Sequence, residues 1–300
     1  MNDSWIAVDW GTSNLRAWAM GPTGPLAQAV SDDGMGKLQP DQFEPALIRL
    51  IEPWLTAAET SVLACGMVGA RQGWREAPYR AVPCAPVAAG DILQVPTLDR
   101  RISFYIASGL RQDRPADVMR GEETQVAGAL ALTPGFDGVI CAPGTHSKWM
   151  HLSAGEVVSF QTYMTGELYA LLSQQSVLRH SMAGAEGWDD AAFDDGLSDA
   201  LSRPDQIAAR LFSLRAEFLL HGMTPMQARA RLSGLLIGLE LAAAKPYWLG
   251  QRVILIGAPA LAGNYLRALS SQGLHAETLD ATACTLAGLS SLHHQARQSQ

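Results

Sequence analysis

Two segments in different halves of the chain follow the same pattern: an apolar strand, a turn that contains Gly-Thr, and a second apolar strand. The first segment is AVDWGTSNLRAWAM (residues 7–20), and the second is VICAPGTHSKWMHL (residues 139–152). Each apolar run has the length of a strand, and glycine with small polar residues marks a tight turn. A chain that repeats such a hairpin is expected to contain two related parts.

The sequence around the two hairpins extends this repeat. In the first half we expect three strands, a helix and a buried strand, at residues 5–10, 15–20, 26–31, 41–57 and 61–66. After residue 134 the order starts again, with strands at 138–144, 147–152 and 156–162 and a helix near Gly166. A doubly wound dinucleotide-binding fold would alternate strand and helix strictly. We therefore predict an α/β protein with two lobes, residues 1–133 and 134–300, and a central cleft between them.

The rest of the second half is expected to be mainly helical. Helical patterns cover residues 205–220 and 225–245, and residues 252–269 indicate a buried strand, a turn and a helix. A short strand at 275–280 and a helix at 281–296 follow. The acid-rich segment 187–196 does not match a calcium loop, so we expect a solvated loop or helix edge there.

Composition and charge exclude several classes of function. The 300 residues carry a net charge of −7 and no basic run, which argues against nucleic acid as a partner. The four cysteines lack metal-site spacing and indicate reduced thiols. The longest apolar stretch, 232–245, is interrupted by Glu240, which favours a core helix over a membrane span. Since no signal peptide is apparent, the cytoplasm is the expected location. The oligomeric state is left open, with a homodimer as one option.

The two Gly-Thr turns have the chemistry of phosphate-binding loops. Oriented backbone N–H groups in a tight turn form a concavity that binds anions, and glycine allows close approach of the ligand. Such turns are also common without a ligand, but two of them at equivalent places in a repeat favour one shared nucleotide. No GxxxxGK[ST] loop is present, so a P-loop site is excluded. The turn residues expected to bind phosphate are Gly11, Thr12, Ser13, Gly144 and Thr145.

Charged residues flank or occupy both turns. Asp9 precedes the first turn, where its carboxylate suits Mg²⁺, held directly or through water; an Asx turn is the alternative. Lys148 follows the second turn and can neutralise phosphate as a point charge. His146 lies inside the second turn, and the pattern leaves open whether it contacts phosphate or only shapes the turn.

These motifs resemble a known superfamily. VDWGTSNLRAW is similar to the first phosphate motif of the sugar kinase/Hsp70/actin superfamily, CAPGTHSKW to its second, and LIGAPAL to its adenosine-binding turn. Four longer motifs, CGMVGARQGWREAPY, MRGEETQVAGAL, PGTHSKW and TYMTGELYALL, resemble the 2-dehydro-3-deoxygalactonokinase family. The resemblance covers essentially the whole chain, although residues 180–204 match nothing. It implies a two-lobed ribonuclease H-like fold, ATP and Mg²⁺ as cofactors, and further nucleotide contacts from Arg16, Gly257, Ala258 and Pro259.

The resemblance also implies where the catalytic carboxylate lies. In related carbohydrate kinases the catalytic acid opens a helix upstream of the second phosphate turn, in a Gly-Asp-Gln motif. Gly121-Glu122 fits that place, and Glu123 is the competitor. From composition alone, two acids in the first turn of a helix can simply complement the helix dipole. We predict Glu122 as the base that accepts the proton of the attacking hydroxyl, a role that contributes about 10²–10⁴ in rate.

The acceptor implied by the family is a six-carbon 2-keto-3-deoxy acid, phosphorylated on its terminal hydroxyl. Its carboxylate calls for an arginine fork, and Arg71 is the leading candidate, with a surface salt bridge as the alternative. Gln72 and Trp74 are expected to supply polar contact and an apolar wall. Helix capping would explain two of the remaining candidates, Thr165 and Glu167, as well as substrate contact does. The residues expected to reach the substrate from the second lobe are Thr162, Thr165 and Glu167.

The predicted function is ATP-dependent phosphorylation of 2-dehydro-3-deoxygalactonate on its 6-hydroxyl. One alternative is a kinase for another sugar or sugar acid, since the sequence does not separate the galactonate and gluconate epimers. A second is an exopolyphosphatase-like phosphohydrolase, because GEETQ resembles the acidic motif of that family as well. A third is an ATP-driven assembly protein of the actin/Hsp70 kind, for which no segment is left to form a peptide-binding domain.

Overall fold

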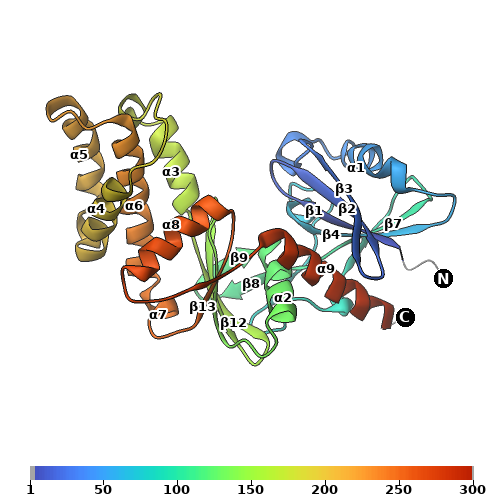
Figure 1. The fold of residues 1–300 in the computed structure, drawn as a ribbon. Helices are drawn as coiled ribbons and strands as arrows, with labels where there is room; N and C mark the ends of the chain where they lie inside the picture. The colour runs from blue at the N-terminus through green and yellow to red at the C-terminus, as the bar shows by residue number, and fades with distance from the viewer. Residues whose placement is uncertain (1–3, 299–300) are drawn as a thin grey trace. The chain divides into compact units, whose positions relative to one another are not determined.

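The computed structural model describes residues 4–298, which form two compact units (Figure 1). Of the described residues, the first unit contains 4–137, 152–159 and 280–298, and the second contains 138–151 and 160–279. Among the described residues, every helix is too short or too polar to cross a bilayer. Each unit is built on its own β-sheet.

Unit 1 contains a six-stranded sheet in the order β3-β2-β1-β4-β7-β6. β1 pairs antiparallel with β2 and parallel with β4, and the three predicted strands and the buried strand after them are confirmed. Alternate side chains of β1 enter two cores, with Val8 on one face and Ala7 on the other. The strands are β1 (Trp5–Trp10), β2 (Leu15–Gly21), β3 (Gly24–Ser31), β4 (Thr60–Gly66), β6 (Leu93–Val95) and β7 (Ile102–Ile106).

Helix α1 (Phe43–Ile51) packs on this sheet through Phe43, Leu47 and Ile51, which are fully buried. The helix is shorter than the predicted range of 41–57. Pro53 ends it, because proline lacks the N–H for the next helical hydrogen bond and its ring clashes with the preceding turn. The chain continues as a short 3-10 turn, Glu52–Trp54.

A second, three-stranded sheet of unit 1 had no counterpart in the sequence prediction. It contains β5 (Tyr79–Ala81), β8 (Gly109–Asp113) and β9 (Ala116–Met119), in the order β5-β8-β9. β9 leads directly into helix α2 (Glu122–Leu132), whose first two residues are the two candidate catalytic acids. This small sheet therefore positions the start of α2 and its two glutamates.

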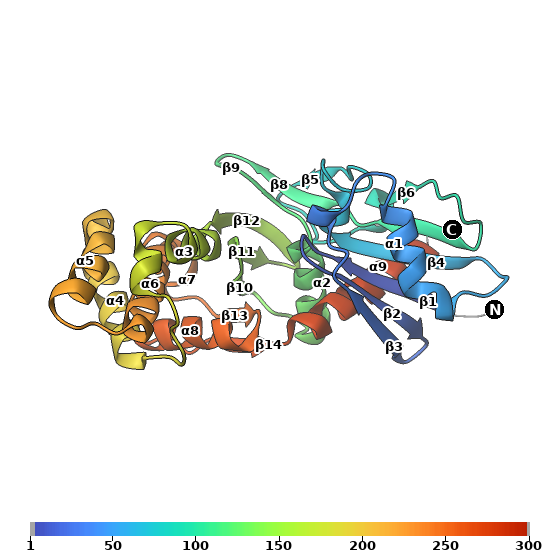
Figure 2. The ribbon, with the colours of Figure 1, turned by 90° about the horizontal axis from the view of Figure 1, so that it is seen from above.

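Helix α2 lies beside helix α9 (Ala281–Gln298) in both ribbon views (Figures 1 and 2). Two glycines allow the close crossing. A methyl group on Gly128 would lie 1.7 Å from the carbonyl oxygen of Cys284, and one on Gly288 would lie 1.9 Å from that of Thr124. These distances are far below van der Waals contact, so the backbones of the two helices touch directly.

The units differ from the predicted division at residue 133. Helix α9 adds Leu289 and Leu292 to the core that contains Trp5, so the end of the described chain belongs with the beginning. The hairpin tip Leu152–Ser159 also groups with unit 1. Sequence order does not reveal this, because the packing of a late helix on early strands depends on tertiary structure.

Unit 2 contains a five-stranded sheet in the order β12-β11-β10-β13-β14. β10, β13 and β14 run parallel. Helix α3 (Thr165–Gln174) follows the first three strands, as predicted from the repeat, and helix α8 (Pro259–Ser270) follows β13. The strands are β10 (Gly138–Ala142), β11 (Ser147–Ser153), β12 (Glu156–Tyr163), β13 (Val253–Ile256) and β14 (Glu277–Leu279).

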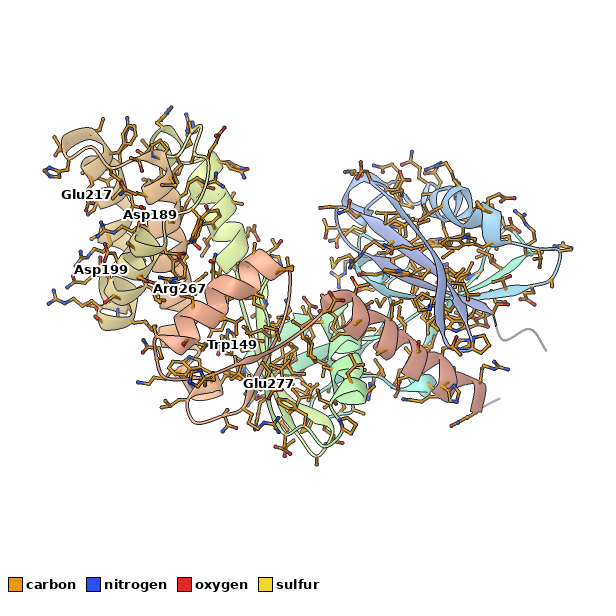
Figure 3. All side chains as sticks on the ribbon, viewed as in Figure 1. Trp149, Asp189, Asp199, Glu217, Arg267 and Glu277 are labelled. Carbon is orange, nitrogen blue, oxygen red and sulfur yellow. The ribbon has the colours of Figure 1, made fainter. Side chains whose placement is uncertain are left out.

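Helices α4, α5 and α6 form a group within unit 2 (Figures 1 and 2). Arg231 of α6 pairs with Asp199 of α4 at 3.1 Å and with Glu217 of α5 at 2.8 Å, and both acids lie in this group in Figure 3. The acid-rich segment 187–196, for which a solvated loop or helix edge was expected, contains the start of α4 at Asp190, and Phe193 within it is completely buried. The bounds are α4 (Asp190–Ser202), α5 (Ile207–Leu220), α6 (Pro225–Ala243) and α7 (Lys245–Trp248).

Candidate active site

The first Gly-Thr turn joins β1 to β2 and is held by backbone hydrogen bonds, one within the turn and two from residues 35 and 36. The N–H of Gly11 donates to the carbonyl of Asn14 at 3.0 Å, and the carbonyls of Gly11 and Thr12 each accept a hydrogen bond of 2.9 Å from residues 35 and 36. Gly34 is required for this contact, because a methyl group on it would lie 2.1 Å from the carbonyl carbon of Ser13. The Thr12 and Ser13 side chains remain exposed.

Asp9 and Arg16 are cross-strand partners on β1 and β2 and form an ion pair. A second nitrogen of Arg16 donates to the Thr282 hydroxyl of α9 at 3.4 Å. Gly66, at the end of β4, has a positive φ of 91°, and a methyl group there would lie 3.4 Å from Oδ1 of Asp9. The described residues contain no cluster of three or more potential metal ligands. A single carboxylate is nevertheless sufficient for Mg²⁺ when phosphates and water complete its coordination.

Helix α2 begins beside Asp9. Its N-cap residue, Gly121, has a φ of 106°, and a methyl group on it would lie 3.3 Å from the Cα of Gly66. Two glycines with positive φ therefore meet where β4 ends and α2 begins, and side chains there would block the approach. This packing brings both acids to the region of Asp9 within unit 1.

The two acids have different surroundings. Glu123 is fully buried, and its oxygens accept hydrogen bonds from the Gly121 N–H at 2.6 Å and the Thr124 hydroxyl at 3.0 Å. Glu122 is half-buried, and one of its oxygens accepts from the backbone N–H of Arg120 at 3.1 Å. Only Glu122 keeps its side chain partly open to solvent, which a general base needs in order to reach a substrate hydroxyl.

The predicted acceptor residues of unit 1 separate into exposed and packed ones. Arg71 is exposed, and its guanidinium lies 3.5 Å from the Glu76 carboxylate. Gln72 is exposed as well. Trp74 differs, because its ring stacks on Phe104 at 4.5 Å between centroids and belongs to the unit 1 core. Most of the Trp74 ring, which was predicted to form an apolar wall for the substrate, therefore packs against the core of unit 1.

The second Gly-Thr turn, between β10 and β11, is held by the start of α3. The N–H of Glu167 donates to the carbonyl of Thr145 at 3.0 Å, and a methyl group on Gly166 would lie 2.3 Å from the carbonyl oxygen of Gly144. Nε2 of His146 lies 2.5 Å from the Glu167 carboxylate. His146 and Glu167 therefore meet at the turn.

Capping of helix α3 does not explain the side chains around this turn. Lys148 is almost fully buried, and its ammonium donates to the carbonyl of His146 at 3.4 Å. The Thr165 hydroxyl donates to Glu240, while the N-cap position of α3 is Met164, which makes no side-chain cap. Thr162 lies on β12, at some remove along the chain from the turn.

The turn borders a cavity of about 610 Å³ inside unit 2. Helix α8 contributes one wall and begins directly after Gly257 and Ala258, with Pro259 as its first residue. Gly257 contacts the second turn, since a methyl group on it would lie 3.3 Å from the carbonyl oxygen of Pro143. The lining residues are Gly144, Thr145, Thr165, Gly166, Tyr169, Trp188, Ser233, Leu236, Ile237, Ala260, Leu261, Asn264 and Tyr265.

Comparison with known proteins identifies the family. The model of the family described as 2-keto-3-deoxy-galactonokinase matches residues 9–292. The chain belongs to this family. A probable 2-dehydro-3-deoxygalactonokinase of Rhizobium meliloti (strain 1021) is 41% identical over 291 residues, which cover 95% of each chain. The 2-dehydro-3-deoxygalactonokinase of Escherichia coli (strain K12) is 34% identical over 295 residues, covering 98% of this chain and 99% of that protein.

Solved structures confirm the fold predicted from the resemblance. The crystal structure of a candidate 2-dehydro-3-deoxygalactonokinase from Sinorhizobium meliloti is 41% identical, with a TM-score of 0.90, and covers 97% of this chain and 98% of that one. A candidate N-acetylglucosamine kinase from Porphyromonas gingivalis is 13% identical, with a TM-score of 0.50 and coverage of 98% and 99%. This second likeness concerns the fold alone.

In this member of the 2-keto-3-deoxy-galactonokinase family, Arg120 is a residue at the site that the sequence prediction missed. Its side chain is almost fully buried, stacks over the Tyr79 ring at 4.3 Å, and donates to the carbonyl of Ala77 at 2.7 Å. Among the described residues, its Nε and Nη1 atoms have no hydrogen-bond partner. The sequence shows Arg120 only as the first residue of the RGEE motif. That its cationic side chain is buried cannot be predicted from the motif, because burial depends on the tertiary structure.

The 2-keto-3-deoxy-galactonokinase chain also offers a test of the buried acid. Burial and the neighbouring Glu122 carboxylate raise the pKa of Glu123 to about 7. Because this is above the ordinary value of 4.5, Glu123 contributes stability that is fully present below pH 4.5 and lost as the pH rises through 7. Between pH 5 and 8 we expect Glu123→Gln to lose less stability than the wild type, by up to about 3 kcal/mol. Urea unfolding across this range measures the difference, and parallel pH curves would contradict it.

Proposed function

We propose that this chain transfers the γ-phosphate of ATP to the 6-hydroxyl of 2-dehydro-3-deoxygalactonate, giving 2-dehydro-3-deoxy-6-phosphogalactonate and ADP in galactonate catabolism. The names of its relatives support the substrate. The observation that carries the chemistry is the start of α2, where a half-buried Glu122 lies in the region of Asp9 and the first Gly-Thr turn. ATP is the phosphate donor expected of a kinase family.

Unit 2 supplies the nucleotide pocket in this proposal. Its cavity is bordered by the second Gly-Thr turn and by the turn that opens α8, the segments that resemble the second phosphate motif and the adenosine-binding turn. Thr145 and Lys148 are proposed to contact phosphate, with Lys148 as a point charge. His146 and Glu167 are proposed to shape that turn, since they pair with each other. Binding of both Gly-Thr turns to one nucleotide stays a prediction from the sequence.

Asp9 is the proposed Mg²⁺ ligand of unit 1. Its carboxylate sits at the first turn and pairs with Arg16, which offers a positive charge in the same place. Mg²⁺ usually takes one or two carboxylates and completes its octahedron with phosphate oxygens and water, and Asp9 satisfies this need. When bound, the ion would neutralise charge on the phosphates.

Glu122 is the proposed base. The 6-hydroxyl oxygen forms a bond to the γ-phosphorus while the bond from that phosphorus to the β–γ bridging oxygen breaks and ADP leaves. Glu122 accepts the hydroxyl proton as the new bond forms, so that the alkoxide does not accumulate. Glu123, buried behind it, holds the first turn of α2 through the Gly121 N–H.

Arg71 is proposed to bind the carboxylate of the sugar acid, supported by its exposure and its loose 3.5 Å contact with Glu76. Gln72 and the partly buried Trp74 are proposed to complete the acceptor site of unit 1. Contact of the substrate with Thr162 of unit 2 stays a prediction from the sequence. Thr165 and Glu167 are proposed to support the second turn, since each side chain is engaged within unit 2. Their contact with the substrate stays a prediction from the sequence. We also infer a cytoplasmic enzyme, since the four cysteines are free thiols, as in a reducing compartment.

An ADP-release assay coupled to a dehydrogenase tests the proposed function directly. We expect release with 2-dehydro-3-deoxygalactonate at a rate at least about tenfold above that with the gluconate epimer or hexoses, since contacts to one stereocentre discriminate by this order. Mass spectrometry should find the phosphate on the terminal carbon. Release of inorganic phosphate at the same rate without any acceptor would instead identify a phosphohydrolase.

A further inference from the structure

A buried carboxylate in helix α6 contacts three segments around the nucleotide cavity of unit 2. We propose that Glu240 is a positioning residue, which holds β11, the start of α3 and helix α8 in the arrangement that binds the nucleotide. The proposal rests on the function proposed above and assigns a role to a residue that the sequence marked only as an interruption of an apolar helix.

The hydrogen bonds of Glu240 define this role. One carboxylate oxygen accepts from the indole N–H of Trp149 on β11 at 2.8 Å. The other accepts from the Tyr265 hydroxyl of α8 at 2.7 Å and from the Thr165 hydroxyl of α3. Tyr265 extends the network, since its oxygen lies 2.9 Å from the hydroxyl of Ser147. Figure 3 shows Trp149 at the sheet of unit 2.

The partners of Glu240 lie next to the surfaces that would touch the nucleotide. Thr165 and Tyr265 line the cavity themselves. Ser147 is the first residue after the second turn, and it projects to the same face of β11 as Trp149 because side chains alternate along a strand. Thr165 precedes Gly166, where an added methyl group would lie 2.3 Å from the carbonyl oxygen of Gly144. A shift at Glu240 would therefore move both the turn and the cavity wall.

Packing of the core alone does not require a carboxylate at position 240. Its side chain is 2% exposed, and burial raises its pKa, although the hydroxyl and indole donors oppose that effect. Its neighbour on α6, Leu241, fills the core without any such cost. A buried carboxylate that lost its donors would be strongly destabilising, whereas a satisfied one specifies a single arrangement of the groups around it.

Because all three partners donate hydrogen bonds to Glu240, substitution by glutamine tests these hydrogen bonds specifically. An indole N–H can only donate, and both hydroxyls donate to the carboxylate. Glutamine has nearly the same size, but its NH₂ group must face one set of donors, so at least one hydrogen bond is lost or reversed. The volume of the core is thus kept while the link between the segments is weakened.

The test compares nucleotide binding in the wild type and Glu240→Gln. Calorimetric titration with ADP and Mg²⁺ is expected to give a Kd about tenfold higher for the variant, which corresponds to about 1.4 kcal/mol. The KM for ATP should rise by a similar factor, while the KM for the sugar acid should stay within about twofold. A purely structural defect would lower the active fraction without separating the two KM values.

Two further variants keep the result decisive. Tyr265→Phe removes the hydroxyl that joins Ser147 to Glu240, and it should raise the ADP Kd without adding its full effect to that of Glu240→Gln in the double variant. Leu241→Val is the matched control, since it should lower stability by about 1 kcal/mol and leave the ADP Kd unchanged.

The possible outcomes separate this inference from the proposed function. Wild-type ADP affinity in a folded Glu240→Gln protein would overturn the inference. If that variant does not fold, Tyr265→Phe carries the test, and unchanged ADP affinity there would overturn it. Wild-type protein that binds ADP but phosphorylates no sugar acid would refute the proposed function alone.

Discussion

Glu122→Gln should lower kcat by at least about 10²-fold, because the amide cannot accept the proton of the 6-hydroxyl as the bond to phosphorus forms. Glutamine keeps the shape of the side chain and can still accept the hydrogen bond from the Arg120 N–H. Nucleotide affinity should therefore change by less than about threefold, since the change is made at the reacting atoms. Steady-state ADP release and calorimetric titration with ADP measure the two quantities on the same preparation.

Glu123→Gln is the matched control for this result, since it makes the same chemical change one residue further along α2. Glu123 is fully buried and its oxygens are taken by the Gly121 N–H and the Thr124 hydroxyl, so kcat should fall by less than about tenfold. A larger loss for Glu123→Gln than for Glu122→Gln would exchange the roles of the two acids. Comparable activity of both variants and the wild type would remove the base from this helix.

Gly128→Ala should destabilise the first unit by about 3 kcal/mol or more, because an added methyl group would overlap the carbonyl oxygen of Cys284. The atom it meets belongs to a helix backbone, which cannot yield as the end of a flexible side chain could. The two helices must therefore separate, and the core contacts made by α9 weaken with them. The midpoint of thermal unfolding, monitored by circular dichroism, is the direct measurement.

Gly263→Ala makes the same substitution inside helix α8, where nothing lies within 4 Å of the new methyl group. Alanine has the better helix propensity, so stability should rise by about 0.5–1 kcal/mol. Opposite signs for the two variants would establish that the α2–α9 crossing, rather than helix propensity, decides the effect. A melting temperature for Gly128→Ala equal to that of the wild type would show that these helices do not need direct backbone contact.

The strands of both hairpins were predictable because each combines an apolar run with a strong turn signal. The β-β-β-α order of both halves followed from the same signals, and the structure contains it. The small sheet β5-β8-β9 was not predictable, because its strands of three to five residues carry no clear alternation. For the start of α4 a solvated loop or helix edge was expected, and the buried face that includes Phe193 was not predicted because acidic residues dominate the segment.

The candidate site was predictable only as far as local chemistry reaches. The Gly-Thr turns and the acids that open α2 stand out in the sequence, and the structure contains each in the expected local form. The burial of Arg120 and Glu240 and the packing of Trp74 depend on segments far away in the chain. No pattern within one motif carries that information, so such residues are assigned only once the fold is known.

The placement of α9 has a consequence for biosynthesis. During translation, residues 138–279 leave the ribosome with their own sheet and helices complete, while the earlier strands still lack the helix that covers Trp5. The apolar surface around Trp5 therefore stays uncovered until α9 has been synthesised. The core around Trp5 is therefore completed only after the sheet of unit 2 has been synthesised.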